Sequence, residues 1–201
     1  MEAHEAHETI HEAAHHDEHH GSEDGGPIKS SRNKKIAVLI SVLAMLLAIV
    51  EAGGKSAQNA SLSANINAND LWTFYQAKTI RLTTLQSSAD LLELAVPGEA
   101  AARKVAEWRA AVRRYDSDPA SGDGRKDLMT RAEAAEAARD TALSAYHMFE
   151  YGAAALQISI VLCSAAVVTG VIGLAIGAGG LGLLGVVFAL LGWLAPTLIH
   201  L

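Results

Sequence analysis

The stretch from residue 32 to residue 96 most constrains the fold, because it holds a membrane-length apolar run and continues into a patterned helix without a proline. The run extends from Ile36 to Ala52, is uncharged except for Glu51, and reaches about 19 residues when Lys35 and Gly53 are counted. At about 1.5 Å per residue, that length just spans a hydrocarbon core of roughly 30 Å. We therefore predict a first transmembrane helix over residues 32–54.

The charges on the two sides of this run predict its orientation. The cations before it are Lys29, Arg32, Lys34 and Lys35, whereas Lys55 is the only cation in the first twenty residues after it. The positive-inside rule then places the N-terminus in the cytoplasm. Two cations that precede the second apolar segment, Arg131 and Arg139, oppose this assignment. Because no small-residue cleavage site follows the run, we expect an uncleaved anchor.

A heptad spacing continues beyond the apolar run and predicts an extramembrane arm over residues 55–150. Its positions are Ala57, Ser61, Ala64, Ala68, Leu71, Tyr75, Lys78, Leu82, Leu85, Ala89, Leu92 and Val96. Alternating steps of three and four residues place them on one side of a helix over about residues 55–96. Pro97 and Gly98 end this helix.

Two further helices are predicted to return toward the membrane, over about residues 99–115 and 126–150. The first carries one face formed by Ala101, Val105, Trp108, Val112 and Tyr115. The second keeps the heptad step through Leu128, Ala132, Ala135, Arg139, Ala142, Tyr146 and Phe149. Turn-forming residues separate them over residues 116–124. The outward helix and the two returning helices have similar lengths, about 60 and 65 Å. The sequence therefore predicts an antiparallel, coiled-coil-like arm.

Trp72, Phe74 and Tyr75 form an aromatic cluster in the arm. Aromatic residues are favoured anchors at protein interfaces, so the cluster is a candidate patch for a protein partner. Their heptad context favours the other interpretation, in which they pack in the arm core against Trp108 or Tyr115.

The last part of the chain, residues 151–201, is apolar and long enough for two crossings. The Gly177-Ala178-Gly179-Gly180 run is the predicted turn, giving spans of about residues 153–176 and 181–199. Gly173 and Gly177 form a GxxxG step, and Gly185, Ala189 and Gly192 extend a small-residue face on the last span. Small residues let transmembrane helices approach closely, either within one subunit or between subunits. The fold class is therefore all-α, an integral membrane protein with three transmembrane helices.

The N-terminal tail and linker, residues 1–31, are rich in His and Glu. As a helix, the tail would place His4, His7, His11 and His15 on one face. Neutral imidazoles at this spacing are candidate ligands for a weak site for Zn or another transition metal. The same histidines would also gain charge near pH 6.5, so a pH-responsive tail and a plain solvated tail remain open. The HExxH matches in this tail lack a third ligand and a cleft, so no protease is predicted.

Glu51 and Lys55 stand four residues apart at the membrane exit, in the order that favours an ion pair on a helix. A carboxylate in a membrane segment also marks ion paths in some proteins. The local pair is the favoured interpretation. A net charge of −6 argues against a nucleic-acid partner.

The chain resembles a bacterial membrane-protein family known as domain of unknown function 4337. The resemblance is sharpest in two stretches, Glu51-Ala52-Gly53-Gly54-Lys55-Ser56-Ala57-Gln58 and Leu71-Trp72-Thr73-Phe74-Tyr75-Gln76-Ala77-Lys78-Thr79-Ile80-Arg81. It implies a bacterial inner-membrane protein and supplies no activity or catalytic residue.

Taken together, these patterns predict a non-enzymatic membrane protein without a cofactor, an oligomeric scaffold or docking element. Its expected partners are the lipid bilayer, further copies of the chain and a protein that binds the arm. The alternative is a channel or transport component whose His-rich tail senses metal or protons. Metal buffering by the tail alone is a third, less favoured hypothesis.

Overall fold

The computed structural model describes residues 27–118 and 120–198, and their regular secondary structure consists of helices joined by short turns, without a strand. Its helices are α2 (Pro27–Ala95), α3 (Glu99–Asp116), α4 (Arg125–Thr169) and α5 (Ile172–Leu194). The all-α prediction is confirmed. The predicted metal ligands His4, His7, His11 and His15 lie outside the described residues.

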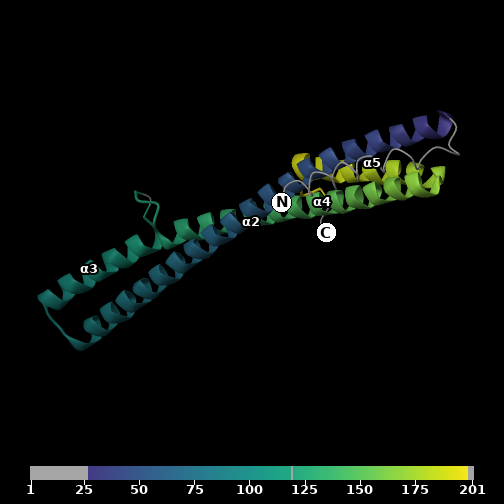
Figure 1. The fold of residues 1–201 in the computed structure, drawn as a ribbon. Coiled ribbons are helices and arrows are strands. Elements are labelled where there is room, and N and C mark those ends of the chain that lie inside the picture. Colours follow the sequence, from purple (N-terminus) through teal and green to yellow (C-terminus); the bar gives the residue numbers. More distant parts are fainter. Residues whose placement is uncertain (1–26, 119, 199–201) are drawn as a thin grey trace, which may run out of the picture.

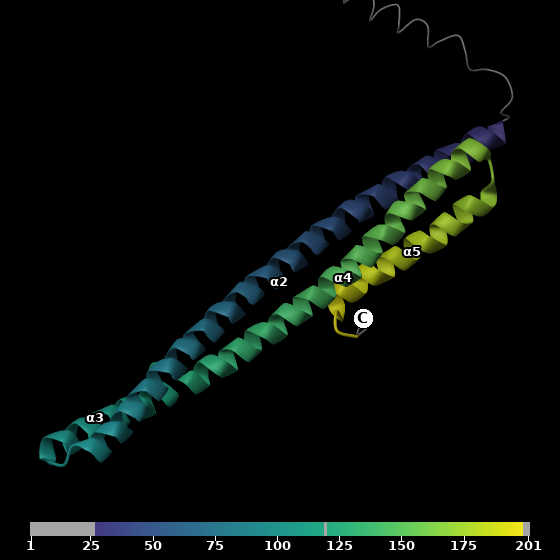
Figure 2. The same cartoon turned by 90° about the horizontal axis from the view of Figure 1, so that it is seen from below.

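The helices form a long, thin rod (Figure 1). α2 runs along its whole length, and α3 and α4 follow each other end to end along α2 in the opposite direction. α5 folds back along α4 at the other end, so that α4 lies between α2 and α5 (Figure 2). The rod is therefore a helix pair in the arm and a three-helix bundle at the apolar end.

The heptad positions of the arm form its interior. On α2 they are buried or half-buried from Ala57 to Leu92, and only Val96 at the tip is exposed. Ala68 and Leu71 pack there against Leu128, Ala132 and Ala135 of α4. Ala68 and Ala132 are 2% and 0% exposed. Such small side chains let the two helices approach closely.

The apolar ends of α2, α4 and α5 share a second core. It contains Ile36, Leu43 and Val50 of α2, Phe149, Leu156 and Cys163 of α4, and Ala178 of α5. Each of these helices is long and apolar enough to cross a membrane.

The turn between the last two apolar helices differs from the prediction. It lies at Gly170 and Val171, whereas Gly177, Gly179 and Gly180 are helical residues of α5. Gly170 has φ 72°, a left-handed conformation, and its N–H donates to Ala166 O over 3.0 Å to close α4. One glycine suffices to end a helix in this way.

The GxxxG step of Gly173 and Gly177 makes no contact within the described part of the chain, so its contact between subunits stays a prediction. A Cβ atom added to Gly173 or Gly177 would meet no other atom within 4 Å. The contacting glycines are Gly152 of α4 and Gly185 of α5, each of whose added Cβ would lie within 2.9 Å of the other's carbonyl oxygen. Backbone therefore meets backbone at this crossing. Gly185 and Gly192 do form a packed small-residue face, as expected.

Candidate functional site

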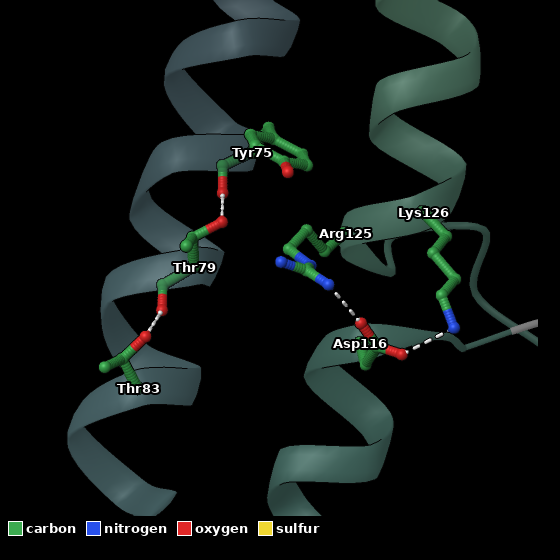
Figure 3. A network of polar contacts seen from close by, with 6 residues as sticks. All are labelled: Tyr75, Thr79, Thr83, Asp116, Arg125 and Lys126. Carbon is green, nitrogen blue, oxygen red and sulfur yellow. Dashed lines mark hydrogen bonds and ion pairs between the residues drawn. The ribbon is translucent and has the colours of Figure 1, made fainter. Parts of the chain in front are cut away.

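The candidate functional region is the arm, and its most structured polar feature lies where α3 gives way to α4. We call this the arm junction and define it by Tyr75, Asp116, Arg125 and Lys126. Asp116 is the last residue of α3, and Arg125 and Lys126 are the first residues of α4. Tyr75 reaches the junction from α2, as Figure 3 shows.

The Asp116 carboxylate joins the two returning helices. Its Oδ1 accepts a hydrogen bond from a terminal guanidinium nitrogen of Arg125 over 2.8 Å, and its Oδ2 lies 2.7 Å from Lys126 Nζ (Figure 3). The guanidinium also lies 5.7 Å from the centre of the Tyr75 ring. The dipole of α4 favours an anion near its N-terminus, whereas the dipole of α3 disfavours one at its C-terminus. The junction therefore ties α3 to α4 and both to α2.

These contacts lower the pKa of Asp116. The hydrogen bond from Lys126 is the largest cause. Burial comes second and raises the pKa, and the hydrogen bond from Arg125 lowers it further. A carboxylate whose pKa is lower in the folded state stabilises the fold at pH values above its unfolded pKa of 3.8. This stabilisation is lost as the pH falls below that value and through the folded pKa.

Replacing Asp116 by asparagine is expected to lower the free energy of unfolding at pH 7 by about 1 kcal/mol, the scale of a partly exposed ion pair. The asparagine keeps the shape but removes the charge that holds Arg125 and Lys126. The difference from the unchanged protein should shrink as the pH falls through and below 3.8. Thermal unfolding of the solubilised full chain, followed by circular dichroism, measures both effects. The control is Asp140→Asn, because Asp140 is 63% exposed and pairs with its neighbour Arg139. An equal loss in both variants would contradict the assignment.

The aromatic cluster is divided between the core and the surface. Trp72 Nε1 donates to Glu136 Oε1 of α4 over 2.9 Å, and the Trp72 and Tyr75 rings meet edge to face at 5.3 Å. Trp72 and Tyr75 thus pack in the arm, as the favoured interpretation expected. Phe74 does not, because it is 61% exposed.

The predicted partners of the cluster also differ. The Tyr115 ring lies 5.7 Å from Lys78 Nζ, which accounts for the one charged position of the heptad face. The Trp108 ring lies 5.7 Å from Lys104 Nζ of its own helix. Trp72 and Tyr75 therefore pack against α4, because α4 and not α3 lies opposite this part of α2.

A shallow groove lies at the arm tip, between the end of α2 and the start of α3. Its volume is about 440 Å³, and its lining includes Val96, Gly98, Val105 and Arg113. Arg109 borders it and pairs with Glu93 and, at 3.6 Å, with Asp90. The groove combines apolar walls with charged rims, which suits contact with another protein.

Glu51 contacts a different partner from the one predicted. Its Oε1 accepts a hydrogen bond from Gln157 Nε2 of α4 over 3.3 Å. Lys55 makes no ion pair with it in the described part of the chain. Gln157 was recognisable in the sequence as a rare polar residue of an apolar segment, but its partner lies 106 positions away.

The junction itself was not anticipated. Asp116 was assigned only to a turn. An acidic residue at the end of one helix and two basic residues at the start of the next would have been enough to predict an ion pair between them. The metal hypothesis gains nothing from the rest of the chain, since residues 27–118 and 120–198 hold no group of three His, Cys, Asp or Glu side chains suited to a metal ion.

Comparison with known proteins gives the family. The family described as "Domain of unknown function (DUF4337)" matches residues 32–195. The chain belongs to this family. The DUF4337 match begins within the cationic segment and ends one residue beyond α5, so it includes both the arm and the apolar helices. No curated protein and no solved structure matches the chain.

Proposed function

We propose that the protein is a non-enzymatic membrane scaffold, without a cofactor, whose arm holds a docking surface at a fixed height above the bilayer. One observation carries this proposal: α2 and α4 pass without a break from the apolar end into the arm, over 69 and 45 residues. Unbroken helices paired along their length resist bending better than a flexible linker. From Lys55 to Ala95 the arm extends about 60 Å at 1.5 Å per residue.

We propose further that α2, α4 and α5 cross a cell inner membrane with the N-terminus in the cytoplasm. The support is that the cations before the apolar run and the turn between α4 and α5 lie at the same end of the rod. Lys35 lines a small apolar cavity together with Gly170 and Val171 of the α4–α5 turn. The cations before the apolar run, Lys29, Arg32, Lys34 and Lys35, and this turn would then lie on the cytoplasmic side, and the arm on the other.

The channel or transport alternative has less support from the apolar end. Ser159 is 0% exposed, and its hydroxyl donates to Ala178 O of α5 over 2.6 Å. A hydroxyl that bonds to the neighbouring backbone fastens two helices together, whereas an ion path presents its polar groups to water. We therefore favour the scaffold.

A membrane-impermeant, thiol-reactive photo-crosslinker tests the placement and the docking together. It would be attached to Ala102→Cys, an exposed position on α3 at the tip, in a Cys163→Ala background. We expect labelling in intact cells and, after illumination, one discrete adduct with a different protein. If Ala102→Cys is labelled only after the cells are permeabilised, the proposed orientation is wrong. The photo-crosslinking would then be carried out in permeabilised cells to test for a docking partner.

The matched control is a shortened arm that lacks residues 61–67 of α2 and residues 137–143 of α4, one heptad from each helix. Removing whole heptads keeps the interior positions in phase. This variant should label equally well, but its adduct yield should fall, because the tip lies about 10 Å closer to the membrane. The absence of any adduct in the full-length chain, or an unchanged yield in the shortened arm, would contradict docking at a fixed height.

A further inference from the structure

A small cavity lies where the start of α2 meets the turn between α4 and α5, which Figure 2 shows at the same end of the rod. Its volume is about 230 Å³, and its walls include Leu39 of α2, Val171 of the turn and Ala175 of α5. Among the described residues, Lys35 is the one charged residue that borders it. We call it the Lys35 cavity. It combines an apolar interior with a cationic edge.

The positive charge of Lys35 has no acidic neighbour in the helices around the cavity. The first acidic residue of α2 is Glu51, the last of α4 is Glu150, and the sequence of α5 contains none. At 1.5 Å per residue, Glu51 lies about 24 Å from Lys35 along α2, and Glu150 lies about 30 Å from the end of α4. Salt screens charges separated by more than about 10 Å, so neither carboxylate neutralises Lys35.

The N-terminus of α5 adds positive potential to the same cavity, which Ile172, the first residue of α5, also borders. The first N–H groups of a helix have no partner within it and carry a partial positive charge. The N-cap residue of α5 is Val171, whose apolar side chain cannot accept a hydrogen bond from them. An anion held by Lys35 at this edge would therefore also be favoured by α5.

We propose that the Lys35 cavity binds one phospholipid whose headgroup carries a net negative charge. The ammonium group of Lys35 pairs with the phosphate, and part of one acyl chain fills the apolar interior. Basic pockets between transmembrane helices recognise anionic headgroups in this way. The inference rests on the membrane crossing proposed above and does not depend on the scaffold role.

The N-terminal tail is the other candidate occupant, because it is acidic and precedes Lys35 closely in the sequence. Residues 1–26 contain eight acidic residues, but their large apolar residues are only Met1 and Ile10. A segment of this composition matches the charge of Lys35 and leaves the apolar walls of the cavity without a partner. A phospholipid matches both, so we favour the lipid.

Lipid binding by the purified full-length chain tests the proposal. The chain in detergent would be mixed with equal amounts of a phosphatidylglycerol and a phosphatidylcholine that carry the same acyl chains. Native mass spectrometry then counts the lipids bound to each chain. We expect one bound phosphatidylglycerol and at least about fivefold less phosphatidylcholine, because a basic residue at this level attracts an anionic headgroup.

The variant Lys35→Gln removes the charge at the cavity, and Lys34→Gln is its matched control. Lys34 is exposed like Lys35, but it does not border the cavity. We expect Lys35→Gln to lower the preference for phosphatidylglycerol about fivefold. Lys34→Gln should lower it about twofold at most, because salt screens a charge that does not touch the headgroup. An equal loss in the two variants would overturn the proposal.

The variant Ala175→Leu fills the cavity without changing any charge. Its matched control is Ala37→Leu, because Ala37 is exposed and does not border the cavity. We expect Ala175→Leu to reduce bound phosphatidylglycerol about fivefold, since the added side chain takes the place of part of the acyl chain. Ala37→Leu should leave binding unchanged. Circular dichroism checks that both variants stay helical. Unchanged binding in Ala175→Leu would contradict the placement of the acyl chain.

Equal binding of the two lipids by the unchanged chain would also overturn the proposal, and it is the result expected if the acidic tail covers Lys35. The outcome is independent of the docking test and of the orientation, because the purified chain carries the cavity whichever side of the membrane it faces. A chain without a docking partner would still bind the lipid, and a chain without the lipid would still give the adduct at Ala102→Cys.

Discussion

Replacing Phe149 by alanine is expected to lower the free energy of unfolding by about 3–5 kcal/mol, the range for removing a buried aromatic ring. Phe149 is 6% exposed and sits where all three apolar helices meet. A Cβ atom on Gly53 of α2 would lie 2.9 Å from its ring, and one on Gly192 of α5 would lie 3.4 Å away. The ring therefore fills the space that these two glycines leave.

The matched control for Phe149→Ala is Ile158→Ala on the same helix, because Ile158 is 53% exposed. It removes a large apolar side chain without opening a cavity inside the bundle. Reversible unfolding of the full chain in mixed micelles, with increasing denaturing detergent, gives the free energy of each variant. A loss in Phe149→Ala no larger than in Ile158→Ala would refute the central position of the ring.

The second large effect is expected from Gly185→Leu, which should separate α4 from α5. An added Cβ on Gly185 would lie 2.8 Å from Gly152 O and 2.9 Å from Leu156 Cγ, and one of these contacts is with backbone. A backbone carbonyl cannot relieve the clash by changing rotamer, as a side chain can, so the helices must move apart. Overpacking typically costs about 1–3 kcal/mol, and a leucine at a backbone contact should reach the upper end or exceed it.

Gly177→Leu on the same helix is the control for Gly185→Leu. It makes the same chemical change and gains the same helix propensity. A Cβ atom added at Gly177 has no neighbouring atom within 4 Å. We expect it to leave stability unchanged or slightly raised in the same micelle assay. Equal destabilisation by both leucines would show that Gly177 also lies in a contact, and would count against the α4–α5 crossing described here.

Much of the arm was predictable because its signals are local. A heptad pattern needs only the helical period, so the face containing Ala68, Leu71 and Ala132 could be recognised without knowing the partner helix. The end of the helix before Pro97 was equally predictable, because a proline disfavours the helical conformation at the residue before it. The candidate site was less predictable. Asp116 and Trp72 depend on Arg125, Lys126 and Glu136, and no local rule selects those partners among the many charges of the arm.

The sequence by itself determined the class of molecule: apolar segments of membrane length, an uninterrupted helix leaving the first of them, and a polar arm with one packed face. These properties follow from hydrophobic length and from the 3.6-residue period, which are local. Only the tertiary structure decided where the last two helices turn and which glycines touch. Gly170 and the run at Gly177 to Gly180 meet the same local criteria for a turn. Packing separates them, because α5 contacts α4 through the face containing Gly185 and Gly192, and the run at Gly177 lies within that helix.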